Sequence, residues 1–264
     1  GLRKSKDKRY LEVIDFIGNY ENNYLLPIAL YGDRTYKKEH VRRTMQNNYL
    51  PGASTVHFED VIKERIFKKL NTTNLKTLKS LRESYTLVKF KLGHAPMMMD
   101  FVTHGDKDPY LFVEYKKSYY NFKQHVDHGE STLGAMHIKL LEFISMEIAN
   151  GRRLEEIALL KYLLSLKEVS VRHFQDYLYE NYGVPTTIGS IEGAVNVLSM
   201  SFIKEADAKK YGALLLVKLV NDRIMLNEEF ENLYDNKEFK AYVDDALDYG
   251  EQRFLADYDP KKYY

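Results

Sequence analysis

Apolar side chains recur every three or four residues along most of this chain, and this period predicts helices. Four such segments precede residue 150, and turn-forming residues such as Gly93 and Gly151 follow two of them. The predicted helices cover residues 60–70, 75–92, 110–126 and 133–149. We therefore expect a fold that is mainly α with minor β (α+β).

Short apolar runs typical of β-strands occur near the N-terminus. Residues 11–16 form one run, which Gly18 interrupts, and residues 54–58 form a second. An apolar patch at 25–30 and a charged segment of helical character at 35–48 lie between them. Asp60 has a side chain suited to an N-cap, so the pattern predicts a helix start there.

Residues 152–227 show a different order of elements. Three helical segments come first, and two apolar runs on either side of Asn221-Asp222 then predict a hairpin. Ser170 is the expected N-cap of the second helix, and Gly183 its end. This order indicates a winged helix. The third helix, which usually enters the DNA major groove, is poor in Arg and Lys here, so reading of base edges is not favoured.

Composition narrows the class of protein. The chain has 264 residues, of which 44% are hydrophobic, so two or three modules with ordinary cores are expected. It contains no cysteine, which excludes disulfides and thiolate zinc sites and fits a cytoplasmic location. No apolar run approaches the roughly 20 residues needed to span a bilayer, so no membrane partner is expected.

Charge is distributed unevenly along the chain. Residues 1–91 hold 19 Lys and Arg against 10 Asp and Glu, whereas residues 228–259 hold 3 against 11. A basic front half attracts phosphate, and an acidic helical tail can dock on it or repel misplaced nucleic acid. Both stretches also fit ordinary solvated helix faces.

Candidate chemistry is sparse. His125 and His128 lie three residues apart near Glu130, but this spacing is a weak metal signal, and we expect no metal site. Gly189 to Gly193 resembles a nucleophile elbow with the serine misplaced, so an ordinary helix start is expected. The pairs Glu228-Glu229 and Asp244-Asp245 predict a solvated face.

The stretch 115–123 alternates aromatic and basic residues. Rings such as Tyr119 and Tyr120 can stack on unpaired bases while Lys116 and Lys117 hold the backbone. Core packing of the rings is the alternative. The sequence has no G-x-x-x-x-G-K-[ST] loop, which excludes an isolated ATPase.

A resemblance to a known family rests on several short segments. Gly1-Leu2-Arg3-Lys4 and the following 8–20 resemble the close of motif VI and the next strand in superfamily 2 DEAD/DEAH-type helicases. Residues 92–96, Asp100-Phe101 and the stretch from Glu229 to Asp245 are similar to the uncharacterised C-terminal region of one bacterial branch of these helicases. Members of that branch often carry a phospholipase-D-like nuclease domain at the front.

The resemblance implies a division of the chain and a function. It implies the end of RecA-like lobe 2 at 1–50. The pattern of elements and charges predicts a helical connector at 51–151, a winged helix at 152–227 and an acidic helical tail at 228–264. The chain would be the rear portion of an ATP-dependent helicase, a hydrolase whose ATP and Mg²⁺ the rest of the motor binds. Arg3 would act as the motif VI arginine beside the missing lobe. This chain alone would hold no cofactor and would not be catalytic.

The expected partners are single-stranded or forked DNA and the rest of the motor. Basic residues are expected to follow the phosphates. These are Lys63, Lys68, Lys69, Lys76 and Lys79, together with the 115–123 stretch. A protein-interaction module that docks a nuclease domain or another partner is the alternative, and a free-standing winged-helix regulator is a third.

Overall fold

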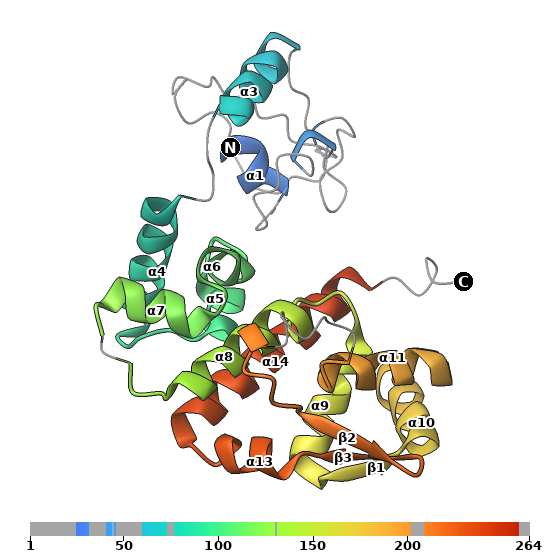
Figure 1. Cartoon of the computed structure of the whole chain (residues 1–264). Helices are drawn as coiled ribbons and strands as arrows, with labels where there is room; N and C mark the ends of the chain where they lie inside the picture. Colours follow the sequence, from blue (N-terminus) through green and yellow to red (C-terminus); the bar gives the residue numbers. More distant parts are fainter. Residues whose placement is uncertain are drawn as a thin grey trace, which may run out of the picture. The chain divides into compact units, whose positions relative to one another are not determined.

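The computed structural model describes residues 25–31, 41–43, 45, 60–72, 77–129, 131–201 and 209–258. The chain divides into two compact units, Gly1–Leu75 and Lys76–Tyr264 (Figure 1). The described part is mainly helical with one small antiparallel sheet, which confirms the predicted fold class. None of its helices is both long and apolar enough to cross a membrane.

In the first unit, the described helices are α1 (Leu25–Tyr31) and α3 (Asp60–Thr72), with a helical turn at 41–43. Helix α3 includes Asp60 itself, so it begins at the predicted position. Ile28, Met45 and Ile66 are buried and form the apolar interior of this part. The predicted strands at 11–16 and 54–58 lie outside the described residues.

The second unit begins with four helices around an aromatic cluster. They are α4 (Leu78–Leu92), α5 (Met98–His104), α6 (Tyr110–Lys116) and α7 (Tyr119–Asp127). Five rings from these helices stack or meet edge to face: Tyr85, Phe101, Phe112, Tyr119 and Phe122. The closest pair, Phe112 and Phe122, has its centroids 4.5 Å apart, a favourable stacking distance that adds to the burial.

The predicted single helix at 110–126 is wrong, because the chain breaks between α6 and α7. Lys117 adopts φ 69°, in the left-handed region, and ends α6. Ser118 then accepts a hydrogen bond from the Asn121 N–H and starts α7. The break lets both α6 and α7 place aromatic residues in the same cluster, which one straight helix would separate.

Helix α8 (Ala135–Phe143) continues into a π-helical turn, η1 (Ile144–Ile148). Behind it runs α14 (Lys237–Asp257), preceded by the short α13 (Glu228–Tyr234). A Cβ built on Gly250 of α14 would lie 2.8 Å from the Ala149 Cα, so only glycine permits this approach of the two backbones.

Helix α14 is a central element of the second unit, which corrects the expectation of an acidic tail. It packs against α5, α8, η1 and α9 (Figure 1). Its apolar face, which includes Phe239, Val243 and Leu247, is buried, and its acidic residues occupy the other positions. The Lys161 Nζ of α9 lies 2.8 Å from the Asp248 Oδ1 of α14.

The remaining elements are α9 (Leu154–Leu166), β1 (Glu168–Ser170), α10 (Val171–Tyr182), α11 (Ile188–Leu198), β2 (Val217–Val220) and β3 (Arg223–Leu226). The sheet order is β1-β3-β2, antiparallel throughout. Asn221 and Asp222 both have positive φ, as a type I′ hairpin turn requires. The three helices and the hairpin are as predicted, whereas the sequence analysis missed β1.

Candidate functional site

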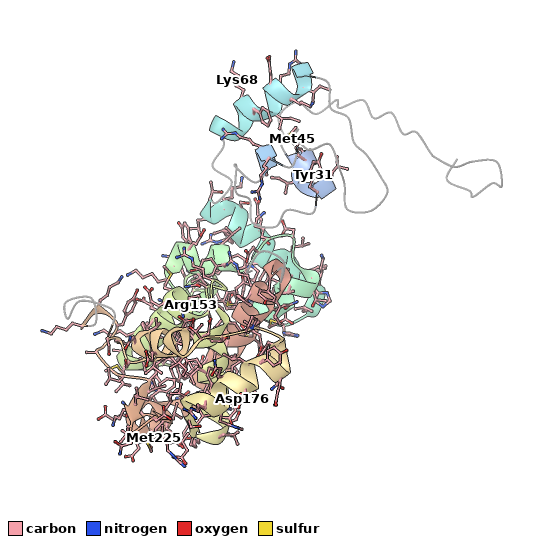
Figure 2. The ribbon with its side chains drawn as sticks, turned by 90° about the vertical axis from the view of Figure 1, so that its right-hand side faces the viewer. Tyr31, Met45, Lys68, Arg153, Asp176 and Met225 are labelled. Carbon is pink, nitrogen blue, oxygen red and sulfur yellow. The ribbon has the colours of Figure 1, made fainter. Side chains whose placement is uncertain are left out.

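The predicted nucleic-acid-binding residues are spread over both units. Arg3 and Lys76 lie outside the described residues, as does the side chain of Lys69. Lys63 and Lys68 belong to α3 of the first unit, where Lys68 is exposed (Figure 2). Lys79 lies on α4, Lys116 and Lys117 at the end of α6, and Tyr119 and Tyr120 on α7. These last five belong to the second unit.

The structure does not support base stacking by Tyr119 and Tyr120. Their exposed fractions are 2% and 1%, and both rings lie in the core. The Tyr119 hydroxyl donates to the Pro96 carbonyl at 2.6 Å, and the Tyr120 hydroxyl lies 3.0 Å from the Ser131 Oγ. The prediction is therefore wrong for these two residues, and the core-packing alternative is correct, because ring area on an amphipathic helix is most stable when buried.

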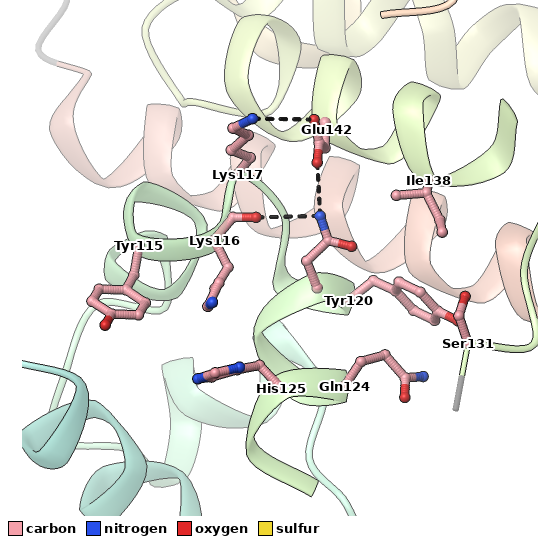
Figure 3. A pocket seen from close by; sticks show the side chains of 10 residues that line it. Tyr115, Lys116, Lys117, Tyr120, Gln124, His125, Ser131, Ile138 and Glu142 are labelled. Atoms are coloured by element: carbon pink, nitrogen blue, oxygen red, sulfur yellow. Dashed lines mark hydrogen bonds and ion pairs between the residues drawn. The ribbon is translucent and has the colours of Figure 1, made fainter. Parts of the chain in front are cut away.

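A pocket of about 480 Å³ lies between the end of α6, α7 and α8 (Figure 3). Its size is in the range of small-ligand sites. Ten residues line it: Tyr115, Lys116, Lys117, Tyr120, Asn121, Gln124, His125, Ser131, Ile138 and Glu142. The 115–123 stretch that the sequence analysis singled out therefore forms one side of a hollow.

Lys116 and His125 form the cationic end of this pocket. Their side chains extend toward the same space in Figure 3. Lys116 has no carboxylate within ion-pair distance in the described part of the chain, and its Nζ lies 5.7 Å from the centroid of the Tyr115 ring. The Tyr115 side chain is 42% exposed, so one aromatic surface beside the cation faces solvent.

A positively charged residue of α4, Arg82, also influences His125. Slight desolvation of the ring, together with the positive charges of Lys116, Arg82 and His128, lowers the pKa of His125. Arg82 is an exposed residue of α4 and makes no ion pair with any described residue. We call Arg82, Lys116 and His125 the cationic cluster; it joins α4, α6 and α7.

The opposite wall of the pocket carries a paired carboxylate. The Asn121 Nδ2 donates to the Glu142 Oε1 at 2.9 Å and to the Lys116 carbonyl at 3.3 Å. The Lys117 Nζ lies 4.0 Å from the Glu142 Oε2. Of the two lysines predicted to follow phosphate, Lys117 thus partly neutralises Glu142, and Lys116 is the one without an acidic partner in the described part of the chain.

The other candidate groups have structural roles. No group of three or more His, Asp or Glu in the described residues has a metal-binding arrangement, and His128 caps α7 in the left-handed conformation. Gly189 lies in the first turn of α11, as expected of a helix start.

The predicted solvated face is wrong for Asp245. Its carboxylate accepts hydrogen bonds from the Met98 and Met99 N–H groups, at 2.7 and 3.1 Å, and so caps α5. Burial raises the pKa of Asp245 to about 6.

The comparison with protein families covers the helices that hold this pocket. A family model described as a domain of unknown function (DUF8090) matches residues 81–256, about two thirds of the chain. The chain belongs to the DUF8090 family. The matched segment runs from α4 to α14 and contains the whole cationic cluster. None of the curated proteins compared with the chain matches it.

Sequence reasoning missed two members of the cationic cluster in the DUF8090 segment. His125 was considered only as a metal ligand, and Arg82 was not considered at all. One signal was present for Arg82: it lies three, four and seven residues from Tyr85, Thr86 and Lys89, so it shares a helix face with them. Tyr85 and Lys89 both contact Asp127 of α7, so this face of α4 lies against α7.

Proposed function

We propose that the DUF8090 segment binds the sugar-phosphate backbone of a DNA strand, single-stranded or forked, at the cationic cluster. The observation that carries this proposal is the convergence of Arg82, Lys116 and His125 from three helices. None of the three has an acidic partner among the described residues. The positive charges of Lys116 and Arg82 disfavour protonation of His125, so an anion that neutralises them is bound favourably and lets His125 take up a proton.

The neighbouring groups fit a flexible strand better than a rigid duplex. Tyr115 offers a partly exposed ring next to Lys116, and stacking of a base on such a ring contributes about 1–3 kcal/mol. The pocket is a local hollow rather than a long groove, so it suits an unpaired nucleotide. Lys79, exposed one turn before Arg82 on α4, extends the basic surface.

The segment α9–β3 supports an accessory role beside a motor. We interpret its three helices and three-stranded sheet as a winged helix, and α11 contains no Lys or Arg. Such a domain can separate strands by its shape without reading bases. On the resemblance to DEAD/DEAH-type helicases, we infer that the chain serves an ATP-dependent DNA helicase or translocase in the cytoplasm. ATP and Mg²⁺ would be bound by the rest of that motor.

Fluorescence anisotropy of a labelled single-stranded oligonucleotide, measured across a series of salt concentrations, tests the proposal. Lys116→Glu should weaken binding at least about tenfold and lower the salt slope by about 0.7, the value of one phosphate contact on a single strand. Lys237→Glu reverses an exposed charge at the start of α14 and should change neither. No binding at low salt, or equal effects of both variants, would contradict the proposal.

A second candidate function is docking of a nuclease domain or another protein. The observation in its favour is the apolar exposure of the hairpin: Leu219, Val220 and Met225 are 49%, 50% and 39% exposed. Val220→Asp and Lys116→Glu separate the two functions. Under docking, the first variant loses the protein partner and keeps DNA; under strand binding, the second variant loses DNA.

A further inference from the structure

The pocket is polarised along its length. Lys116 and His125 lie together at one end, next to Tyr115 (Figure 3). Gln124, Ser131 and the hydroxyl end of Tyr120 lie on the other side. The described residues give the Gln124 side-chain amide no hydrogen-bond partner, so it can donate to and accept from a ligand. The pocket thus has a cationic end and a neutral hydrogen-bonding end.

These two ends match the two halves of one nucleotide. A phosphate is bound by Lys116 and His125, while a sugar hydroxyl or a base edge offers both donors and acceptors, as an amide does. Glu142 adds an acceptor on the wall, held by Asn121 and Lys117. It suits an amino or hydroxyl donor and disfavours a phosphate.

The Glu142 carboxylate limits which part of a strand the pocket can hold. An internal nucleotide has a phosphate on each side of its sugar, so seating it here would bring the second phosphate toward the neutral end and the Glu142 carboxylate. A terminal nucleotide with a single phosphomonoester has no second phosphate in the pocket. Its phosphate also carries about −1.5 to −2 charges at pH 7, against −1 for an internal diester. This higher charge suits a lysine beside a histidine that can take up a proton.

The geometry points to this pocket as the site that takes the phosphorylated end of a DNA strand, with the terminal phosphate on Lys116 and His125. This inference rests on the proposed function, because it specifies which part of the strand the cationic cluster holds. The same chemistry is present in a free nucleoside monophosphate, so the experiment includes that ligand as well.

Protonation of His125 accompanies such binding. The charged groups that face it are Arg82 from α4, Lys116 from α6 and His128 from α7, with Glu142 of α8 on the far wall. The three positive groups lower the pKa of His125 in the empty pocket. A dianionic phosphate reverses that effect, so the imidazole takes up a proton on binding.

The experiment compares four oligonucleotides of one sequence and length in the full chain: a 5′-phosphorylated strand, a 3′-phosphorylated strand, a strand with two hydroxyl ends and a closed circle. One of the phosphorylated strands should bind at least about tenfold tighter than the hydroxyl-ended strand, the size of one charge-assisted hydrogen bond. His125→Ala should remove this difference, because it weakens binding of the phosphorylated strand more than binding of the circle. His104→Ala, at an exposed histidine of α5, should leave the difference intact.

The outcomes separate the two proposals. Equal affinity for all four strands overturns the end-binding inference and leaves strand binding in place. No binding of any strand at low salt overturns both. A preference for a phosphorylated end that persists in both His125→Ala and Lys116→Gln also overturns it, because the end is then held elsewhere. Competition by the free nucleoside monophosphate shows that the terminal nucleotide alone is recognised, which supports the inference.

Discussion

Two regions of the DUF8090 segment differ in the arrangement of their elements and in their surface charge. The region α9–β3 has the element order of a winged helix, but the exposed positions of α11 include Ile188, Glu192 and Asn196 and no cation. The region α4–α7 has no such arrangement, yet it holds the cationic cluster and the pocket. Shape and charge are thus separate, and the shape by itself does not locate the binding surface.

The difference extends to the apolar surface. On the sheet, Val220 and Met225 lie on the face away from the core and are exposed, while Ile224 and Leu226, on either side of Met225 in β3, are buried. On α4–α7, the aromatic residues except Tyr115 and Phe90 are mostly inside. The alternative of protein docking uses the first surface, and the proposed strand binding uses the second.

The largest expected effect comes from reversing charges in one region at a time. Arg82→Glu combined with Lys116→Glu should weaken single-strand binding at least about a hundredfold, since two charge-assisted contacts are replaced by repulsion. Arg172→Glu combined with Lys218→Glu, two exposed cations of α10 and β2, should cost less than about threefold. Anisotropy titrations at one salt concentration measure both, and a reversed order of the two effects would contradict the proposed binding at the cationic cluster and favour the region α9–β3.

Alanine substitutions at two glycines compare how tightly the core and the surface of α11 are packed. Gly250→Ala should lower the free energy of unfolding by about 3 kcal/mol, because the new Cβ meets the Ala149 backbone at 2.8–2.9 Å. Gly189→Ala, whose Cβ meets only the Thr187 hydroxyl at 3.9 Å, should raise it by up to about 1 kcal/mol through helix propensity. Urea unfolding measures both. Equal stability of the two variants would mean that α14 and Ala149 are not in close contact.

The smallest expected effect concerns the attachment of α5 to α14. Burial raises the pKa of Asp245 to about 6, so the folded state holds this proton more tightly than the unfolded state. Its contribution to stability is therefore present below about pH 4 and is lost as the pH rises through 6. Relative to Asp245→Asn, the wild type should lose about 2 kcal/mol between pH 4 and 7, because part of the total of about 3 kcal/mol is already lost at pH 4. Thermal unfolding across this range measures the difference, and parallel pH profiles would contradict it.

Sequence reasoning succeeded where the signal is local. Ser170, Gly183 and Asn221-Asp222 determine a helix start, a helix end and a turn through their own backbone preferences, and all three were placed correctly. The break at Lys117 was missed because a lysine has no preference for positive φ; the packing of the aromatic cluster selects it. Strand β1 was missed because its three residues pair only with β3, far along the chain.

The candidate site was predicted only in part, for the same reason. Lys116 and Lys117 were recognised from a local alternation of basic and aromatic residues, but that pattern does not show which rings are buried or which lysine meets Glu142. The many acidic residues of 228–259 predict a solvated surface, whereas the buried apolar residues of α14 give a weaker pattern in the sequence. Each error reflects a contact between residues distant in sequence.

The bond from Asp245 to α5 joins positions 147 and 146 residues apart. During synthesis, α5 leaves the ribosome long before Asp245 is made. The first helices of the unit therefore reach their final stability only after α14 has folded against them. Truncated chains that end before residue 245 would lose the packing contacts of α14 as well as the Asp245 cap of α5. Fragments intended for biochemical work should therefore extend at least through Asp257.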